Sequence, residues 1–100
     1  MANVRLWFPN SPNTKIIIGK DCMFSYDIEF RTGDGHTVYD INTHEALNPS
    51  EDIIIGNHVW IGRGSTILKG ANIPSNCVVG ANSTVNKKFD KENCMIAGVP

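Results

Sequence analysis

The segment Gly33-Asp34-Gly35-His36 carries the side chains of this sequence best suited to acid–base chemistry. Histidine titrates near neutral pH, so His36 could take the proton from a hydroxyl as that hydroxyl attacks another group. A nearby carboxylate could hold the imidazole in one tautomer; Asp34 is the first candidate, and Glu29 and Asp40 are also close in sequence. Taken alone, however, such a segment is more often an exposed turn.

Secondary-structure elements must hold these groups in place, and a repeat in the sequence indicates which elements they are. The chain repeats with a step of six residues. Aliphatic anchors recur from Ile55 through Ile61, Ile67, Ile73, Val79 and Val85, and a mostly small residue follows each by four positions, namely Val59, Ser65, Ala71, Cys77 and Ser83, with Phe89 as the exception. Upstream, the step continues less regularly through Leu6, Pro12, Ile18, Phe24 and Phe30. A six-residue period fits neither an amphipathic helix nor a long strand. It predicts an all-β parallel β-helix with inward-pointing anchors and three hexads per turn, hence about four coils.

The residues between the anchors must turn the corners of the coil. Positive φ angles are tolerated best by Asn and Gly, so we expect Asn57, Asn76, Asn82, Gly64 and Gly70 at corners. Trp60 is also expected at a corner. We divide the single domain into N-terminal coils (6–36), an extruded loop (37–48), C-terminal coils (49–88) and an extension over the last coil (89–100). Four coils leave two open ends and apolar walls, which predicts self-association.

The composition excludes several classes of protein. The chain has 100 residues, 41% of them hydrophobic, and a net charge of −1 from nine basic and ten acidic residues. We therefore expect no nucleic-acid partner. No apolar run approaches the roughly 18 residues of a membrane span, and Met1–Arg5 is unlike a signal peptide. The three cysteines form no C-x-x-C pair, so we expect a cytoplasmic protein in which Cys22 and Cys77 are inert inward residues.

Three segments of the repeat carry a resemblance to a known family. Ile54–Gly62 (IIGNHVWIG), Val78–Ser83 (VVGANS) and Ile96–Pro100 (IAGVP) resemble the hexapeptide-repeat acyltransferases, most closely the sugar O-acetyltransferases of the galactoside, maltose and capsule type. The resemblance runs from about Ile16 to Pro100. It implies a left-handed coil, a homotrimer with the active site between subunits, acetyl-CoA as co-substrate, and acetyl transfer to a hydroxyl of a sugar or glycan precursor.

The same resemblance assigns roles to particular residues. It makes His36 the general base, with Asp34 as the candidate orienting carboxylate. Backbone at Gly62 and Ala81 matches positions that bind the pantetheine arm, and Lys87 matches a lysine near the cofactor phosphates. We add Trp60 as a wall for the pantetheine or a sugar, Gly80 as a second small residue beside the arm, and Arg63 as a further cation. Trp60 packed at a subunit interface, and glycines that merely suit the hexad, are the alternatives.

Other functions stay open from the sequence. A zinc site of three histidines is disfavoured, because the spacing of His36, His44 and His58 along the chain does not bring the ligands together, so no metal is predicted. Acetylation of an amine on an amino sugar and a non-catalytic trimeric scaffold remain alternatives. Asn82 departs from the Gly-Ala-Gly of the family, and relatives continue past the position of Pro100 with a basic tail; both features weaken the expected cofactor site.

Overall fold

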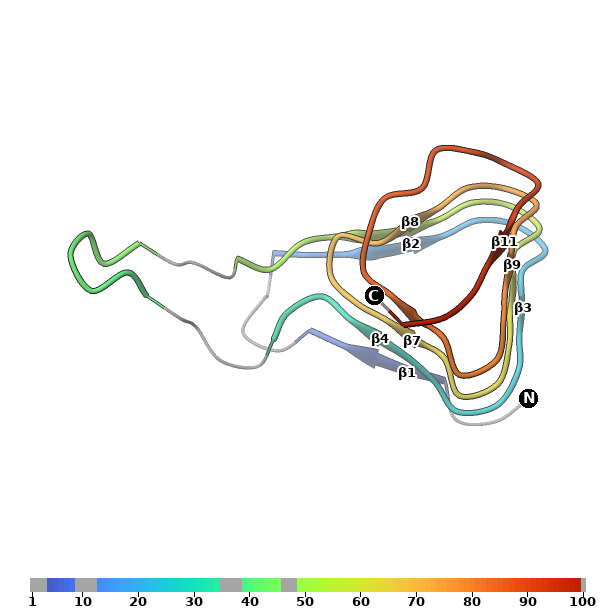
Figure 1. The fold of residues 1–100 in the computed structure, drawn as a ribbon, viewed down its shortest axis with the longest axis horizontal. Helices are drawn as coiled ribbons and strands as arrows, with labels where there is room; N and C mark the ends of the chain where they lie inside the picture. Colours follow the sequence, from blue (N-terminus) through green and yellow to red (C-terminus); the bar gives the residue numbers. More distant parts are fainter. Residues whose placement is uncertain (1–3, 9–12, 35–38, 46–48, 100) are drawn as a thin grey trace.

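The computed structural model describes residues 4–8, 13–34, 39–45 and 49–99. Short parallel strands form a coil with three flat sides (Figure 1). The first sheet contains β1 (Val4–Trp7), β4 (Ile28–Arg31), β7 (Thr66–Ile67) and β10 (Thr84–Val85). The second contains β3 (Met23–Phe24), β6 (Trp60–Ile61), β9 (Val78–Val79) and β11 (Met95–Ile96), and the third contains β2 (Ile16–Ile18), β5 (Ile53–Ile55) and β8 (Asn72–Ile73). The predicted all-β parallel β-helix is confirmed.

The direction of winding can be followed in Figure 1. From blue to red, the chain runs clockwise around the three sides while it comes toward the viewer, which makes the coil left-handed. This is the hand opposite to that of ordinary parallel crossovers, and it agrees with the hand that the family resemblance implied.

The six-residue step corresponds to the core of the coil. All six anchors are buried, from Ile55 (2% exposed) to Val85, and so are the residues four positions later from Val59 to Ser83. Strand partners such as Ile55 and Ile73, or Ile61 and Val79, are three hexads apart along the chain. Each anchor therefore stacks on the equivalent anchor of the next coil, and burying one such aliphatic side chain contributes about 1.5–3 kcal/mol.

The upstream hexads share these columns but lie at one end of the stack. Leu6 pairs with Phe30, and Ile18 pairs with Ile55. Leu6 and Ile18 are nevertheless exposed, because each lies on a strand at the end of its sheet, β1 and β2. Pro12 lies outside the described residues.

The corners follow the predicted chemistry with one correction. Asn76, Asn82, Gly64 and Gly70 have positive φ, as expected, but Asn57 does not; His58, with φ of 54°, takes that conformation instead. The Asn57 side chain links coils, since its Oδ1 accepts a hydrogen bond from the Lys20 backbone N–H at 2.8 Å. Asn57 is therefore a bridging residue between coils.

The extruded loop interrupts the register between the early and the late coils. Ile18 and Ile55, which pair across it, are about twice as far apart in sequence as Ile55 and Ile73, which pair after it. The loop is thus an insertion into one turn of the coil, and its described tip, residues 39–45, lies far from the coil (Figure 1). The Glu51 N–H donates to the Thr32 carbonyl at 2.9 Å, so the loop is closed at its base between Thr32 and Glu51, outside the predicted bounds of 37–48.

The C-terminal segment remains part of the coil. The sequence predicts that residues 89–100 leave the hexad frame and pack over the last coil; the frame does slip, but β11 continues the second sheet, with Ile96 paired to Val79. Ile96 falls one position short of three full hexads after Val79, so the frame slips by one while the sheet continues. Cys77 is buried and Cys22 packs against the core, as predicted for inward residues. In the described part of the chain, no helix is long and apolar enough to cross a membrane.

Candidate functional site

The corner between the first and third sheets brings together groups that could do chemistry. β4 leads through the buried Gly33 into Asp34, and β7 leads into Lys69 on the next coil. The Lys69 ammonium donates a hydrogen bond of 2.8 Å from its Nζ to Oδ2 of Asp34. Asp34 is 47% exposed and Lys69 is 21% exposed, so the pair lies on the rim of the coil.

Lys69 was not among the residues predicted from the sequence. It lies far from Asp34 along the chain, and only the inserted loop brings the two into neighbouring coils. The position of Lys69 in the hexad repeat could have identified it from the sequence. Phe30 and Ile67 are strand partners, and Asp34 and Lys69 follow these two residues into the same corner.

The predicted base, His36, lies outside the described residues, and its role stays a prediction. Of the three candidate orienting carboxylates, Asp34 is the one at the base of the loop, two residues before His36 in sequence. Oε2 of Glu29 lies 3.8 Å from Nε of Arg31, and Asp40 belongs to the loop tip. Asp34 therefore stays the candidate, and Lys69 holds its carboxylate by a charge-assisted hydrogen bond.

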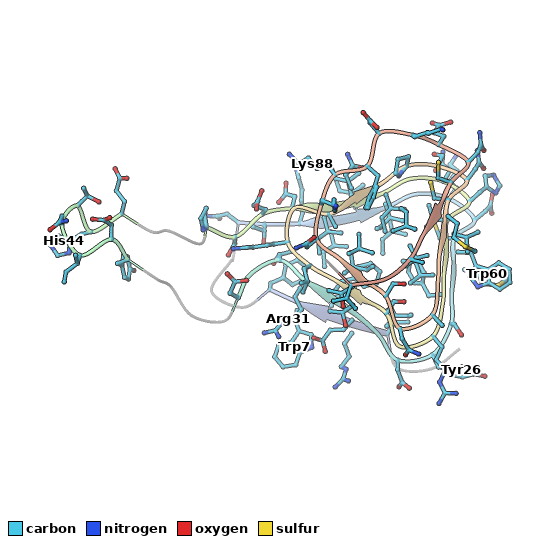
Figure 2. All side chains as sticks on the ribbon, viewed as in Figure 1. Trp7, Tyr26, Arg31, His44, Trp60 and Lys88 are labelled. Carbon is cyan, nitrogen blue, oxygen red and sulfur yellow. The ribbon has the colours of Figure 1, made fainter. Side chains whose placement is uncertain are left out.

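The loop tip is organised around Asp40. Its Oδ1 accepts hydrogen bonds from the backbone N–H groups of Thr43 (2.9 Å) and Asn42 (2.8 Å), forming a side-chain-capped turn. These two bonds, that from Thr43 foremost, lower the pKa of Asp40 from its ordinary value near 3.8. His44 lies in the same turn with φ of 62°, well away from the coil (Figure 2).

His58 occupies a different corner, the one that leads into β6. Its Nε2 lies 3.9 Å from Oδ2 of Asp21, and both side chains are exposed. His58 therefore belongs neither to the loop tip nor to the corner of Asp34 and Lys69.

Trp60 lies on a strand and not at a corner, which corrects our expectation. It is the first residue of β6, and its indole points outward from the second sheet, 53% exposed (Figure 2). The residues before the buried anchors face outward throughout the coil, and in the second sheet Met23, Trp60, Val78 and Met95 pair in one row. Trp60 is therefore part of an exposed apolar row across that sheet.

Four predicted cofactor-binding residues gather at the corner between the second and first sheets. Gly62 and Arg63 follow β6, and Gly80 and Ala81 follow β9 on the next coil. A Cβ at Gly62 would lie 2.7 Å from the backbone nitrogen of Ala81. Gly62 is thus required by the approach of the next coil.

The backbone N–H groups of the two glycines at this corner are already used within the coil. Gly62 donates to the Val79 carbonyl and Gly80 to the Ile96 carbonyl, each at 2.8 Å. What Gly62 and Gly80 could offer to a pantetheine arm is therefore close access to the main chain, without a donor N–H from either glycine.

Lys87 lies at another corner. It follows β10, so it belongs to the same corner as Asp34 and Lys69, and it lines a cavity of about 240 Å³ with residues 95–99. The structure therefore divides the predicted cofactor residues within one chain: Gly62, Arg63, Gly80 and Ala81 at one corner, Lys87 at the other.

A larger groove opens beside the base of the loop. Its volume is about 600 Å³, and it is lined by Asn13, Thr14, Ser50, Glu51, Asp52, Ile54, Gly70, Ala71, Asn72 and Lys88. The groove is polar on its loop side, where the Glu51 carboxylate lies over Gly70. It is a space beside the Asp34 corner in which a polar molecule could lie.

Comparisons with known proteins identify the repeat. Residues 52–87 match the family model described as bacterial transferase hexapeptide (six repeats). The chain is 54% identical over 56 residues to a polysialic acid O-acetyltransferase of Neisseria meningitidis, which covers 56% of this chain and 26% of that protein. It is 41% identical over 70 residues to the galactoside O-acetyltransferase of Escherichia coli, covering 66% of this chain and 32% of the relative.

A solved structure agrees over nearly the whole chain. The crystal structure of the polysialic acid O-acetyltransferase OatWY matches with a TM-score of 0.88 and 43% identity, covering 98% of this chain and 48% of that one. The chain thus spans about half or less of the length of these three proteins.

Proposed function

Because this chain belongs to the hexapeptide-repeat family of bacterial transferases, we propose that it transfers an acetyl group from acetyl-CoA to a hydroxyl of a sugar or glycan. The observation that carries the proposal is the 43% identity to OatWY over a superimposable coil.

In the proposed reaction, the acceptor oxygen attacks the thioester carbonyl of acetyl-CoA. His36 takes the proton of the hydroxyl as the new C–O bond forms, and the proton can then pass to the departing thiolate of CoA. Asp34 orients the imidazole from the base of the loop, and Lys69 fixes Asp34 in turn. No covalent intermediate on this chain is needed.

For the cofactor, we propose that the corner of Gly62, Arg63, Gly80 and Ala81 receives the pantetheine arm. The small side chains fit this role, since Ala81 is exposed and a Cβ at Gly80 would still be 3.3 Å from Ala97. Trp60 is one residue before Ile61 on the same strand and offers an aromatic wall nearby. Lys87, at the loop corner, would meet the phosphates of CoA.

We further propose that the site forms between copies of the chain in a homotrimer. One chain puts the pantetheine corner and the loop corner at opposite ends of the first sheet (Figure 1). A neighbouring copy could bring its own loop corner against this chain's pantetheine corner. The exposed row of Met23, Trp60 and Met95 supplies the apolar surface that such packing would cover.

The proposal can be tested by mixing the protein with acetyl-CoA and a sugar polymer and measuring the release of the free thiol of CoA. An oligomer of sialic acid is the first acceptor to try, because similar proteins include polysialic acid O-acetyltransferases. Release that depends on the acceptor, with acetyl ester on the product by mass spectrometry, supports the proposal. Thiol release at the rate without acceptor, for sialic acid and neutral sugars alike, contradicts it.

A further inference from the structure

The outer face of the first sheet carries an arginine and a tryptophan side by side, in a part of the chain that the acetyl-transfer machinery does not use. Trp7 and Arg31 are partners in the register of β1 and β4 and both point away from the core (Figure 2). The Arg31 guanidinium carbon lies 5.6 Å from the centre of the Trp7 ring, a cation–π contact. About half of Trp7 and a third of the Arg31 side chain are exposed.

Neighbouring residues of β4 and the residue that follows it hold both Trp7 and Arg31 in place. The buried Thr32 donates to the Trp7 carbonyl twice, from its N–H at 3.1 Å and from its hydroxyl at 3.4 Å. Arg31 is steered by Glu29, whose Oε2 lies 3.8 Å from Nε. This fixes the backbone of Trp7 and the direction of the guanidinium before any ligand arrives, which lowers the entropic cost of binding.

The Arg31 guanidinium is under-used in this arrangement. Its Nε is buried, and among the described residues it is the one buried side-chain nitrogen or oxygen without a hydrogen-bond acceptor. The distance of 3.8 Å to Glu29 gives an ion pair but is too long for a hydrogen bond. The buried Nε is out of reach of a ligand, but a guanidinium has five N–H donors in a planar fork that suits a carboxylate, so the terminal nitrogens of the partly exposed Arg31 have capacity for an anionic ligand.

We propose that Trp7 and Arg31 form a subsite for an acidic sugar of the acceptor glycan, with the sugar's carboxylate on the guanidinium and its C–H face on the exposed part of the indole. The inference rests on the proposed function, in which the acceptor is a glycan. Aromatic faces bind the apolar sides of such rings, and arginine pairs with carboxylates in a defined geometry.

The position of the pair relative to the loop supports this role. Asp34 follows Arg31 by three residues, and a chain of three residues spans at most about 11 Å. An oligosaccharide with one acidic residue on Arg31 could therefore present a hydroxyl of the same or a neighbouring residue at the base of the loop. Arg5, the strand partner of Glu29, lies on the same face and provides a second cation for comparison.

The fluorescence of Trp7 provides a direct test. The chain has two tryptophans, so Trp60→Phe leaves Trp7 as the one emitter. Titration of this variant with an oligomer of sialic acid, without acetyl-CoA, should give a saturable change in Trp7 emission that weakens at high salt. Maltohexaose, and the same acidic oligomer with its carboxyls reduced to alcohols, should give none.

Substitutions of Arg31 complete the test, with calorimetry on the chain that keeps both tryptophans as a second measurement. Arg31→Gln should weaken binding of the acidic oligomer by about tenfold or more, Arg31→Lys should lie between, and Arg5→Gln on the same face should change it less than about threefold. Equal binding by Arg31→Gln, or by the carboxyl-reduced oligomer, would overturn the inference. So would Trp7 emission that changes with protein concentration alone, since a second copy would then cover this face.

Different experimental results would overturn the proposed subsite and the proposed activity. Acetyl transfer to the sialic acid oligomer without any Trp7 response would overturn the subsite and leave the activity standing. A saturable Trp7 response in Trp60→Phe, with no transfer to any sugar by the chain that keeps both tryptophans, would leave the subsite and overturn the activity.

Discussion

Lys69 and Asp34 form an ion pair of 2.8 Å across two neighbouring coils, at the corner from which the extruded loop leaves. Lys69 follows β7 and Asp34 follows β4, and these strands pair in parallel, so the contact depends on the stacking register of the coil. In the proposed reaction, Lys69 is a positioning residue that acts on the base through Asp34.

We predict that Lys69→Gln lowers kcat of acetyl transfer about tenfold while KM for acetyl-CoA stays nearly constant, because the loss of positioning affects the transition state. Since both side chains are partly exposed, the free energy of unfolding should fall by no more than about 1 kcal/mol. Kinetics and urea denaturation measure the two effects, with Lys20→Gln as a control at an exposed site. A kcat like that of the unchanged protein would show that Lys69 does not position the base.

Gly62 and Gly80 occupy equivalent positions on successive coils but differ in the space around them. A Cβ at Gly62 would meet the Ala81 backbone nitrogen at 2.7 Å, whereas the nearest atom to one at Gly80 would be the Ala97 Cβ, at 3.3 Å. We expect Gly62→Ala to destabilise the coil by about 1–3 kcal/mol and Gly80→Ala by clearly less. Chemical denaturation of the two variants measures this difference. Equal effects would mean that coil stacking is not what requires glycine at position 62.

The core of this fold could be predicted from the sequence because the buried positions of the coil accept only certain residue types. A narrow three-sided interior admits one aliphatic and one small side chain per hexad, and the chain from Ile55 to Val85 obeys that rule. Residue type indicates the backbone conformation at the corners less strictly than it indicates burial. Asn is favoured where φ is positive, yet at one corner His58 takes that conformation and Asn57 bridges two coils instead.

The site was harder to predict because it depends on which coils are neighbours. The inserted loop places Lys69 beside Asp34, and no local pattern around Lys69 indicates this. The sequence also could not show that Trp60 points outward from a strand, since that required knowing that each strand includes the residue before its anchor.

The loop tip should respond to acid. Hydrogen bonds from Thr43 and Asn42 lower the pKa of Asp40, so the ionised carboxylate favours the capped turn. A lowered pKa in the folded state means that this stabilisation is present above the ordinary value near 3.8 and is lost as the pH falls through the lowered value. We expect the amide NMR signals of Asn42 and Thr43 to shift together in that range. In Asp40→Ala they should already be shifted at neutral pH; unchanged amide signals in that variant would contradict the capped turn.

Trp60 should matter more for association than for the stability of the coil. It is 53% exposed and sits in a row with Met23 and Met95, so Trp60→Ala removes surface and little core. We predict a shift from the proposed trimer toward monomer by sedimentation velocity, with less than about 1 kcal/mol lost in unfolding of the monomer. Ile54→Ala, on the outer face of the third sheet, is the matched control. A variant that sediments as the unchanged protein does would exclude the second sheet as the subunit contact.

The proposed mechanism depends most on His36 as the base, and the rate of acetyl transfer by His36→Ala tests this role most directly. The variant should bind CoA as the unchanged protein does and transfer acetyl roughly 10²-fold more slowly or worse, because proton abstraction contributes to the transition state alone. His44→Ala and His58→Ala, which remove an imidazole at the loop tip and at another corner, should transfer at nearly the original rate. If His36→Ala instead keeps a rate within a few-fold of the unchanged protein, His36 is not the base and the proposed mechanism is wrong.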